Sequence, residues 1–126
     1  MSRLTKQTYT VDLQTKNKPS MMVDLFEQLD SYAISLGDDV RRTAVRQYIG
    51  YRAGRRSFFT LELKQVKIYA YIAIPPGEAQ PWDASDMRDV TKIGHYGMGD
   101  TEFVLRSTDQ LPRLERLIHQ SYLRNR

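Results

Sequence analysis

The sequence has 126 residues, no cysteine, and a net charge of +4 from 19 basic and 15 acidic residues. This length fits one domain with one hydrophobic core, and the lack of cysteine excludes disulfides and thiolate metal sites and suits a reducing cytoplasm. The first residues, MSRLTKQTYT, lack the apolar stretch of a signal peptide, and no apolar run approaches the roughly 20 residues of a membrane-spanning helix. We therefore expect a cytoplasmic protein with no membrane partner.

The charges are distributed unevenly along the chain. Residues 21–40 carry five acids and no base, whereas residues 41–61 carry six arginines and no acid. Arginine favours planar, bidentate contact with phosphate or carboxylate, and it stacks on aromatic rings. The second block is therefore the first candidate for binding an anionic partner.

Residues 1–19 are polar and end in the turn signal TKNKP, which predicts a flexible lead-in ahead of a single domain over residues 20–126. Ser20 is a suitable N-cap for the first helix. Gly37 stands where a left-handed residue would end that helix. The apolar stripe between them recurs at steps of three and four: Met22, Leu25, Phe26, Leu29, Ala33 and Leu36.

Three strands are expected next, at residues 47–52, 57–64 and 67–74, and their short connections make the pairing antiparallel. Pro75 and Pro76 end the third strand. Residues 77–100 read as irregular, with one helical turn at 84–90, before a fourth strand at 102–106. Ser107 or Thr108 caps a closing helix. The pattern predicts an α+β fold of two layers, a four-stranded antiparallel sheet covered on one face by an N-terminal and a C-terminal helix.

Two stretches together resemble a known family. QYIGYRAGRRSFFTLELKQVKIYAYI, followed by DMRDVTKIGHYGMGD, resembles the DUF5655 domain family over roughly residues 20–122. The specific part is IGHYGMGD, that is Ile93, Gly94, His95, Gly97, Gly99 and Asp100. Two features depart from the family pattern: the pair Arg55 and Arg56 after the hairpin glycine, and the linker IPPGEAQPW.

The resemblance implies little about activity. Domains of this family occur alone or fused behind nuclease-like modules, which by analogy favours a nucleic-acid role. Some carry the label "predicted transport protein", to which the lack of a membrane-spanning segment gives no support.

The first candidate site is a ligand loop made of Arg88, Asp89, Gly94, His95, Gly97, Gly99 and Asp100. Its glycines allow positive φ or close approach of a ligand to the backbone. Asp89, His95 and Asp100 are weak candidates for catalysis, because a histidine pKa near 6.5 suits proton transfer and carboxylates with a histidine suit Mg²⁺ or Mn²⁺. The competing and favoured interpretation is structural: the aspartates cap turns and His95 holds the loop. No metal and no cofactor is predicted.

The second candidate site is the sheet face turned away from the helices. If Ile49 and Tyr51 face the core, alternation turns Arg46, Tyr48 and Arg52 outward, together with Phe58, Tyr69 and Tyr71. Arginines interleaved with rings are typical of surfaces that bind single-stranded nucleic acid. The remaining arginines of the block, which are Arg41, Arg42, Arg55 and Arg56, would contact phosphates at the rim. The alternative is a homodimer interface, or internal cover by residues 76–82.

These observations favour a small non-enzymatic binding module with nucleic acid as its partner. Two alternatives stay open. One is an enzyme or a metal- or ligand-binding domain that uses the carboxylates and the histidine of IGHYGMGD. The other is a homodimerisation or adaptor module that uses the aromatic face.

Overall fold

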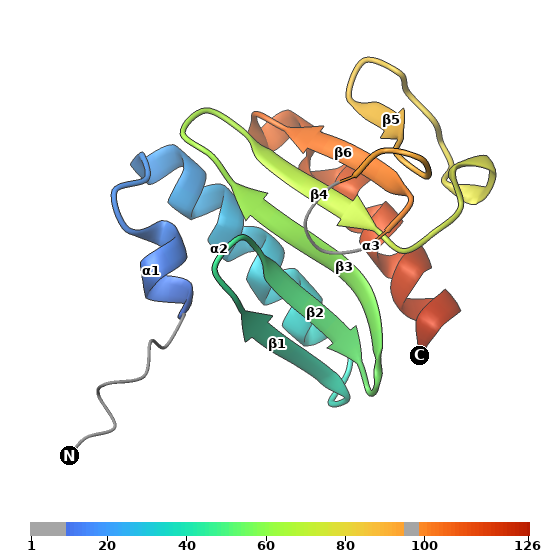
Figure 1. The fold of residues 1–126 in the computed structure, drawn as a ribbon, viewed down its shortest axis with the longest axis horizontal. Coiled ribbons are helices and arrows are strands. Elements are labelled where there is room, and N and C mark those ends of the chain that lie inside the picture. Colours follow the sequence, from blue (N-terminus) through green and yellow to red (C-terminus); the bar gives the residue numbers. More distant parts are fainter. Residues whose placement is uncertain (1–9, 95–98) are drawn as a thin grey trace.

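The computed structural model describes residues 10–94 and 99–126, which form an α+β structure around one open antiparallel sheet (Figure 1). Its elements in chain order are α1 (Val11–Thr15), α2 (Ser20–Ser35), β1 (Val40–Ala44), β2 (Ile49–Ala53), β3 (Arg56–Leu63), β4 (Ile68–Ile72), the 3₁₀ turn η2 (Pro76–Glu78), β5 (Met87–Asp89), β6 (Thr101–Leu105), the 3₁₀ turn η3 (Thr108–Gln110) and α3 (Leu111–Asn125).

The sheet has six strands in the order β1-β2-β3-β4-β6-β5, so the expectation of four strands is wrong. The two additional strands have no readable pattern in the sequence. Strand β1 reads VRRTA, in which two adjacent arginines hide the alternation of a half-buried strand. Strand β5 has only three residues, and it lies where the sequence favoured a helical turn.

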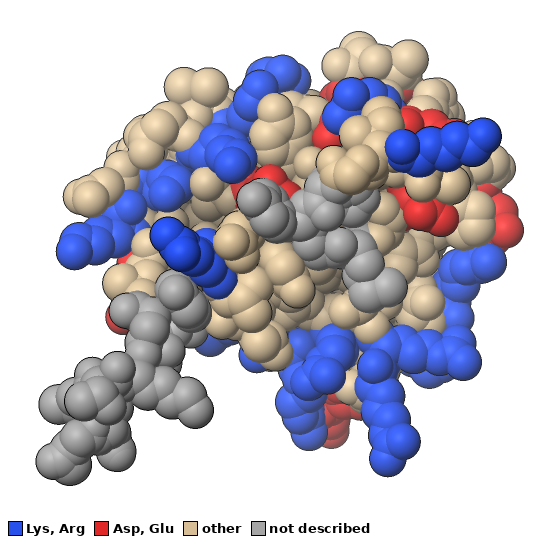
Figure 2. All heavy atoms as spheres, viewed as in Figure 1, with Lys and Arg blue, Asp and Glu red and all other residues tan. Residues whose placement is uncertain are grey.

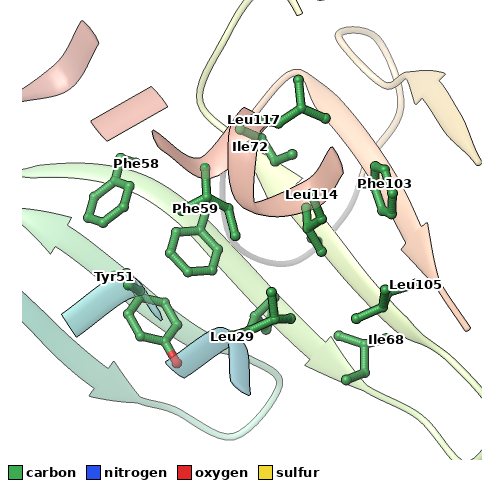
Figure 3. Close-up of a cluster of buried hydrophobic side chains, with 14 of the residues drawn as sticks. Leu29, Tyr51, Phe58, Phe59, Ile68, Ile72, Phe103, Leu105, Leu114 and Leu117 are labelled. Atoms are coloured by element: carbon green, nitrogen blue, oxygen red, sulfur yellow. The ribbon is translucent and has the colours of Figure 1, made fainter. Parts of the chain in front are cut away.

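Helices α2 and α3 lie side by side on one face of the sheet, behind the strands in the view of Figure 1. Their apolar stripes pack on the inward side chains of the strands and form a single core (Figure 3). The largest side chains in it are fully buried: Leu25, Leu29, Ile49, Tyr51, Phe58, Phe59, Leu61, Ile68, Ile72, Phe103, Leu105 and Leu114. The other face of the sheet, called the outer face below, has neither of these helices on it.

A β-bulge in β3 places Phe58 on the face of the sheet that the helices cover. Tyr51 pairs with Phe59, but the next residue, Arg52, pairs with Ser57, so Phe58 is an extra residue in β3. Phe58 and Phe59 therefore both turn toward the helices, and the ring of Phe58 contacts that of Tyr122 at 5.4 Å. The expectation that alternation turns Phe58 outward is wrong, because alternation fails at the inserted residue.

The helix ends agree only in part with the expected caps. Ser107, one of the two expected caps, forms a capping box with Gln110 ahead of α3. Gly37 follows α2, but its φ is not positive. A β-carbon at this residue would lie 2.2 Å from the hydroxyl oxygen of Tyr122, so a side chain here would displace the end of the tyrosine side chain.

Helix α1 lies in the segment expected to be a lead-in, and it contacts the β1 end of the sheet. The side-chain amide of Gln14 donates to the carbonyl oxygens of Val45 and Arg46, the latter at 3.1 Å. Val11 packs against the core. These contacts cover the end of an edge strand, which would otherwise leave unpaired backbone groups open.

Candidate nucleic-acid interface

The strand register places each outward side chain of the sheet. In β1 and β2, Arg41 pairs with Arg52 and Thr43 pairs with Gly50. Gly50 also pairs with Thr60 of β3, which in turn pairs with Tyr71 of β4. Side chains of directly paired residues lie on the same face with their β-carbons about 4.5–5.5 Å apart. A continuous row across four strands therefore forms the outer face.

The register sorts the six arginines of the basic block into three groups. Arg41 and Arg52 are exposed on the outer face. Arg46 and Arg55 lie in the β1–β2 and β2–β3 connections, and both are exposed.

The other two arginines belong to the helix side of the sheet. Arg42 pairs with the inward residue Tyr51, and it forms an ion pair with Asp30 of α2 at 2.8 Å. Arg56 pairs with Ala53, a core residue. The structure thus separates these two from the outward arginines with which the sequence grouped them.

One half of the outer face is basic. Arg41 and Arg52 lie directly opposite each other, an arrangement of like charges that destabilises a sheet unless an anion lies nearby. Between this pair and the β1–β2 connection is an open hollow of about 270 Å³, lined by Thr43, Val45, Tyr48, Gly50, Arg52 and Ser57. Figure 2 shows Lys and Arg side chains gathered along the lower edge of this face, where Figure 1 places the β2–β3 turn.

Tyr48 and Gly50 shape this hollow together. Ring carbons Cε1 and Cδ1 of Tyr48 come within 3.3 and 3.7 Å of the point that a β-carbon on Gly50 would occupy. The missing side chain of Gly50 therefore makes room for the ring. Tyr48 is half-buried, so part of its ring remains on the surface of the hollow.

The other half of the outer face carries carboxylates. Tyr69 pairs with Glu62, and Tyr71 pairs with Glu102. Glu62 is 6% exposed and Glu102 is 4% exposed. Glu102 forms a 3.0 Å ion pair with Arg88, its partner on β5, and the hydrogen bond to Glu102 and its charge raise the pKa of Arg88.

Tyr71 lies between these two acids and is itself only 5% exposed. Burial raises its pKa first, and the charges of Glu62 and Glu102 and a hydrogen bond to Glu102 raise it further. The ring of Tyr69 is half-buried and stacks on that of Tyr71, with the centroids 6.3 Å apart, and the ammonium of Lys67 lies 5.1 Å from the Tyr69 centroid. These two tyrosines face outward as expected, but their charged neighbours are Glu62, Glu102, Arg88 and Lys67 and not the arginines of the basic block.

The expected ligand loop is described only in part, because His95 and Gly97 lie outside the described residues. The carboxylate of Asp89 accepts hydrogen bonds from the backbone N–H and the hydroxyl of Thr91, at 2.9 and 2.6 Å. These bonds lower the pKa of Asp89 and make it part of a local turn. The backbone carbonyl of Asp100 accepts from the N–H of Val90 at 2.9 Å, which closes the base of the loop. Gly94 is exposed in the chain that leads into it.

The glycines of the expected ligand loop were expected to allow close approach to the backbone. At Gly99 the group that approaches is the backbone of Ile72 and not a ligand. The φ of Gly99 is +119°, and a β-carbon would lie 2.8 Å from the backbone N, C and O atoms of Ile72. The loop therefore returns to the sheet by direct backbone contact with β4.

Asp86, in the segment just before β5, has a structural role. It is 8% exposed, and both its oxygens accept from the guanidinium of Arg113 on α3, one of them at 3.0 Å. Gln110 donates to the same carboxylate at 3.2 Å. This ion pair ties the irregular segment before β5 to the closing helix, and the hydrogen bond to Asp86 raises the pKa of Arg113.

Within residues 10–94 and 99–126, no group of three or more histidine, cysteine, aspartate or glutamate side chains is arranged to hold a metal ion. None of the helices in these ranges is both long and apolar enough to cross a bilayer.

The carboxylates of the outer face were missed at the sequence level, although a signal was present. Glu62 alternates with Leu61 and Leu63, and Glu102 precedes Phe103 in TEFVL. Alternation alone would have placed both acids on the face of Tyr69 and Tyr71. Their burial depends on tertiary packing and has no local signal.

The fold and this divided surface define an α+β domain with an open sheet face. The chain belongs to the family described as Domain of unknown function (DUF5655), whose model matches residues 11–125. An uncharacterized protein of Haemophilus influenzae is 26% identical over 106 residues, which are 83% of this chain and 34% of that relative. The chain therefore spans about a third of the relative's length. No solved structure matches.

Proposed function

We propose that this domain is a non-enzymatic module that binds nucleic acid through the basic half of its outer face. The observation that carries the proposal is the pair Arg41 and Arg52, exposed and opposite each other on adjacent strands. Side chains of residues paired in this way start on the same face of the sheet, so both guanidinium groups can reach one phosphate and donate bidentate hydrogen bonds to it. To bind it, the Arg41 guanidinium would exchange its present hydrogen bonds to the carbonyl oxygens of Asp38 and Val40, at 2.7 and 3.0 Å.

Two further arginines near this pair favour a polymeric anion as the ligand. Arg55 at the β2–β3 turn and Arg46 at the β1–β2 connection are exposed and lie beyond the two ends of the hollow that Tyr48 lines. Their separation suits successive phosphates of one strand better than a single small anion. None of the ion pairs between described residues includes Arg41, Arg46, Arg52 or Arg55.

The carboxylates limit the extent of the site. Glu62 and Glu102 already pair with the nearby bases, Lys64 at 3.9 Å and Arg88 at 3.0 Å, so the proposed contact surface stops at β3 and leaves out Tyr69 and Tyr71. This surface is smaller than the sequence suggested, and it consists of Arg41, Arg46, Tyr48, Arg52 and Arg55.

The test measures binding of a fluorescently labelled oligo-dT of about 15 nucleotides by anisotropy between about 50 and 200 mM salt. If the Arg41–Arg52 pair, Arg46 and Arg55 each contact one phosphate, the slope of log affinity against log salt is about −2, since each of these three contacts contributes about −0.7 for a single strand. Arg52→Gln should reduce the slope by about 0.7.

The matched control is Arg116→Gln, which removes the same charge from an exposed residue of α3, in the helix layer on the other face of the sheet. It should leave the slope unchanged. Absence of binding at the lower salt concentration, or equal effects of the Arg52 and Arg116 variants, would refute the proposal.

A further inference from the structure

The hollow on the basic half has the dimensions and lining of a site for one flat group. Its volume of about 270 Å³ is just below the roughly 300–1,000 Å³ of sites for whole small molecules. One wall is the half-buried ring of Tyr48, and Gly50 adds no side chain to the floor. Thr43 and Ser57 place hydroxyl groups in its lining, which can donate to or accept from the edge of a ring.

Two arginines lie at the border of the hollow. Arg52 belongs to its lining, and Arg41 lies directly across from Arg52 on β1. A nucleotide whose phosphate lies against this pair would therefore have its base within reach of the Tyr48 ring. Every base offers a π-face for stacking, and the Arg52 guanidinium can stack as well.

We propose that this hollow binds one unpaired nucleobase against Tyr48, so that the domain selects single-stranded over double-stranded nucleic acid. The inference rests on the proposed function, because the arginine pair must first hold the phosphate. Bases in a duplex are stacked and paired, so their faces are not available to a protein ring. A duplex could contact the arginines but not fill the hollow.

The acidic half of the same face supplies a matched comparison. Tyr69 is half-buried and faces outward like Tyr48, but it pairs directly with Glu62 and lies against Tyr71. The ammonium of Lys67 also lies over that ring, 5.1 Å from its centroid, where a stacked base would have to lie. Comparing the loss of the Tyr48 ring with the loss of the Tyr69 ring therefore distinguishes base stacking from a general effect of removing an aromatic side chain.

The experiment compares three ligands of equal length: oligo-dT, an oligonucleotide of the same charge in which the central nucleotides lack bases, and a duplex. Each is measured with the unmodified chain and with Tyr48→Leu, Tyr48→Phe and Tyr69→Leu, after thermal unfolding has confirmed that each variant is folded. Stacking of one base predicts that Tyr48→Leu weakens oligo-dT binding by roughly 5- to 150-fold. Tyr48→Phe should retain the affinity, and Tyr69→Leu should leave it unchanged.

The ligand without bases should bind the unmodified chain as weakly as oligo-dT binds the Tyr48→Leu variant. If the ligand without bases or the duplex binds as tightly as oligo-dT, or if Tyr48→Leu has no effect, the stacking site is wrong. Salt-dependent binding that persists in that case would leave the proposed function standing. A complete lack of binding to all three ligands would overturn both.

Discussion

The hydroxyl of Tyr51 donates a 2.7 Å hydrogen bond to one carboxylate oxygen of Asp30, and Arg42 binds the other oxygen at 2.8 Å. This carboxylate joins α2 to two neighbouring strands, because Tyr51 belongs to β2 and Arg42 to β1. The ring of Tyr51 is fully buried and stacks on Phe59, with the centroids 4.3 Å apart. Asp30 is therefore the polar end of an otherwise apolar contact between the helix layer and the sheet.

Replacing Tyr51 with phenylalanine keeps the ring and removes the hydroxyl. We expect the free energy of unfolding to fall by about 1–3 kcal/mol, because Asp30 loses one of its two partners in a partly buried place. Urea unfolding measures the change. Tyr48→Phe, on the half-exposed outer ring, is the control and should change stability by less than about 0.5 kcal/mol. Equal effects of the two substitutions would show that the Tyr51–Asp30 bond contributes nothing.

The same hydroxyl predicts a sensitivity to alkaline pH. Burial raises the pKa of Tyr51 first, and the charge of Asp30 and the hydrogen bond to it raise it further. The folded chain therefore keeps a proton that the unfolded chain releases near pH 10, so stability declines as pH rises above about 10. Denaturant unfolding at increasing pH should show a shallower decline for Tyr51→Phe than for the unmodified chain. Parallel curves would contradict this assignment.

A side chain at Gly37 is expected to destabilise the fold. A β-carbon there would lie 2.2 Å from the Tyr122 hydroxyl oxygen and 2.7 Å from a carboxylate oxygen of Asp39. These two groups form a 2.8 Å hydrogen bond that holds the end of α3 against the α2–β1 connection. Gly37→Ala should displace both and destabilise the fold by about 1–3 kcal/mol. Gly77→Ala is the control, because no atom lies within 4 Å of its β-carbon position, and its midpoint of urea unfolding should stay close to that of the unmodified chain.

Two glycines with positive φ should differ in their response to alanine. Gly54, in the β2–β3 turn, has φ +63° and open space around it, so Gly54→Ala should cost only the backbone strain of about 1–2 kcal/mol. Gly99 combines φ +119° with backbone atoms of Ile72 at 2.8 Å, and these atoms belong to a central strand that cannot move aside. Gly99→Ala should therefore lower the melting temperature clearly more than Gly54→Ala. The reverse order would mean that the contact with β4 is not maintained in solution.

The elements with a clear period were predictable from the sequence. In α2, several apolar residues recur with the helical period, and in β3 and β4 several recur with the period of a strand. A capping box marks the start of α3. Strand β1 was not predictable, because Arg42 faces the helix layer and is stabilised there by Asp30, a residue 12 positions away. Strand β5 is defined only by its pairing with β6.

The candidate surface was predictable to the extent that alternation holds. Alternation correctly predicted the residues that point away from the helices, which are Tyr48, Arg52, Tyr69 and Tyr71. It failed at Phe58, where a bulge inserts one residue, and it gave no sign that Tyr71 would be buried. Which arginines share a face is decided by pairing between strands, and that information is not local.

The position of β6 between β4 and β5 has a consequence for how the chain assembles. Strands β1 to β4 pair with their neighbours in sequence, so they can form through short loop closures. Strand β6 joins β4 only by closing the long connection over residues 73–100, whereas β5 pairs with β6 across the shorter connection over residues 90–100. The three residues of β5 pair on one side only, at the edge of the sheet, so their amides should exchange with solvent deuterium well before those of β3.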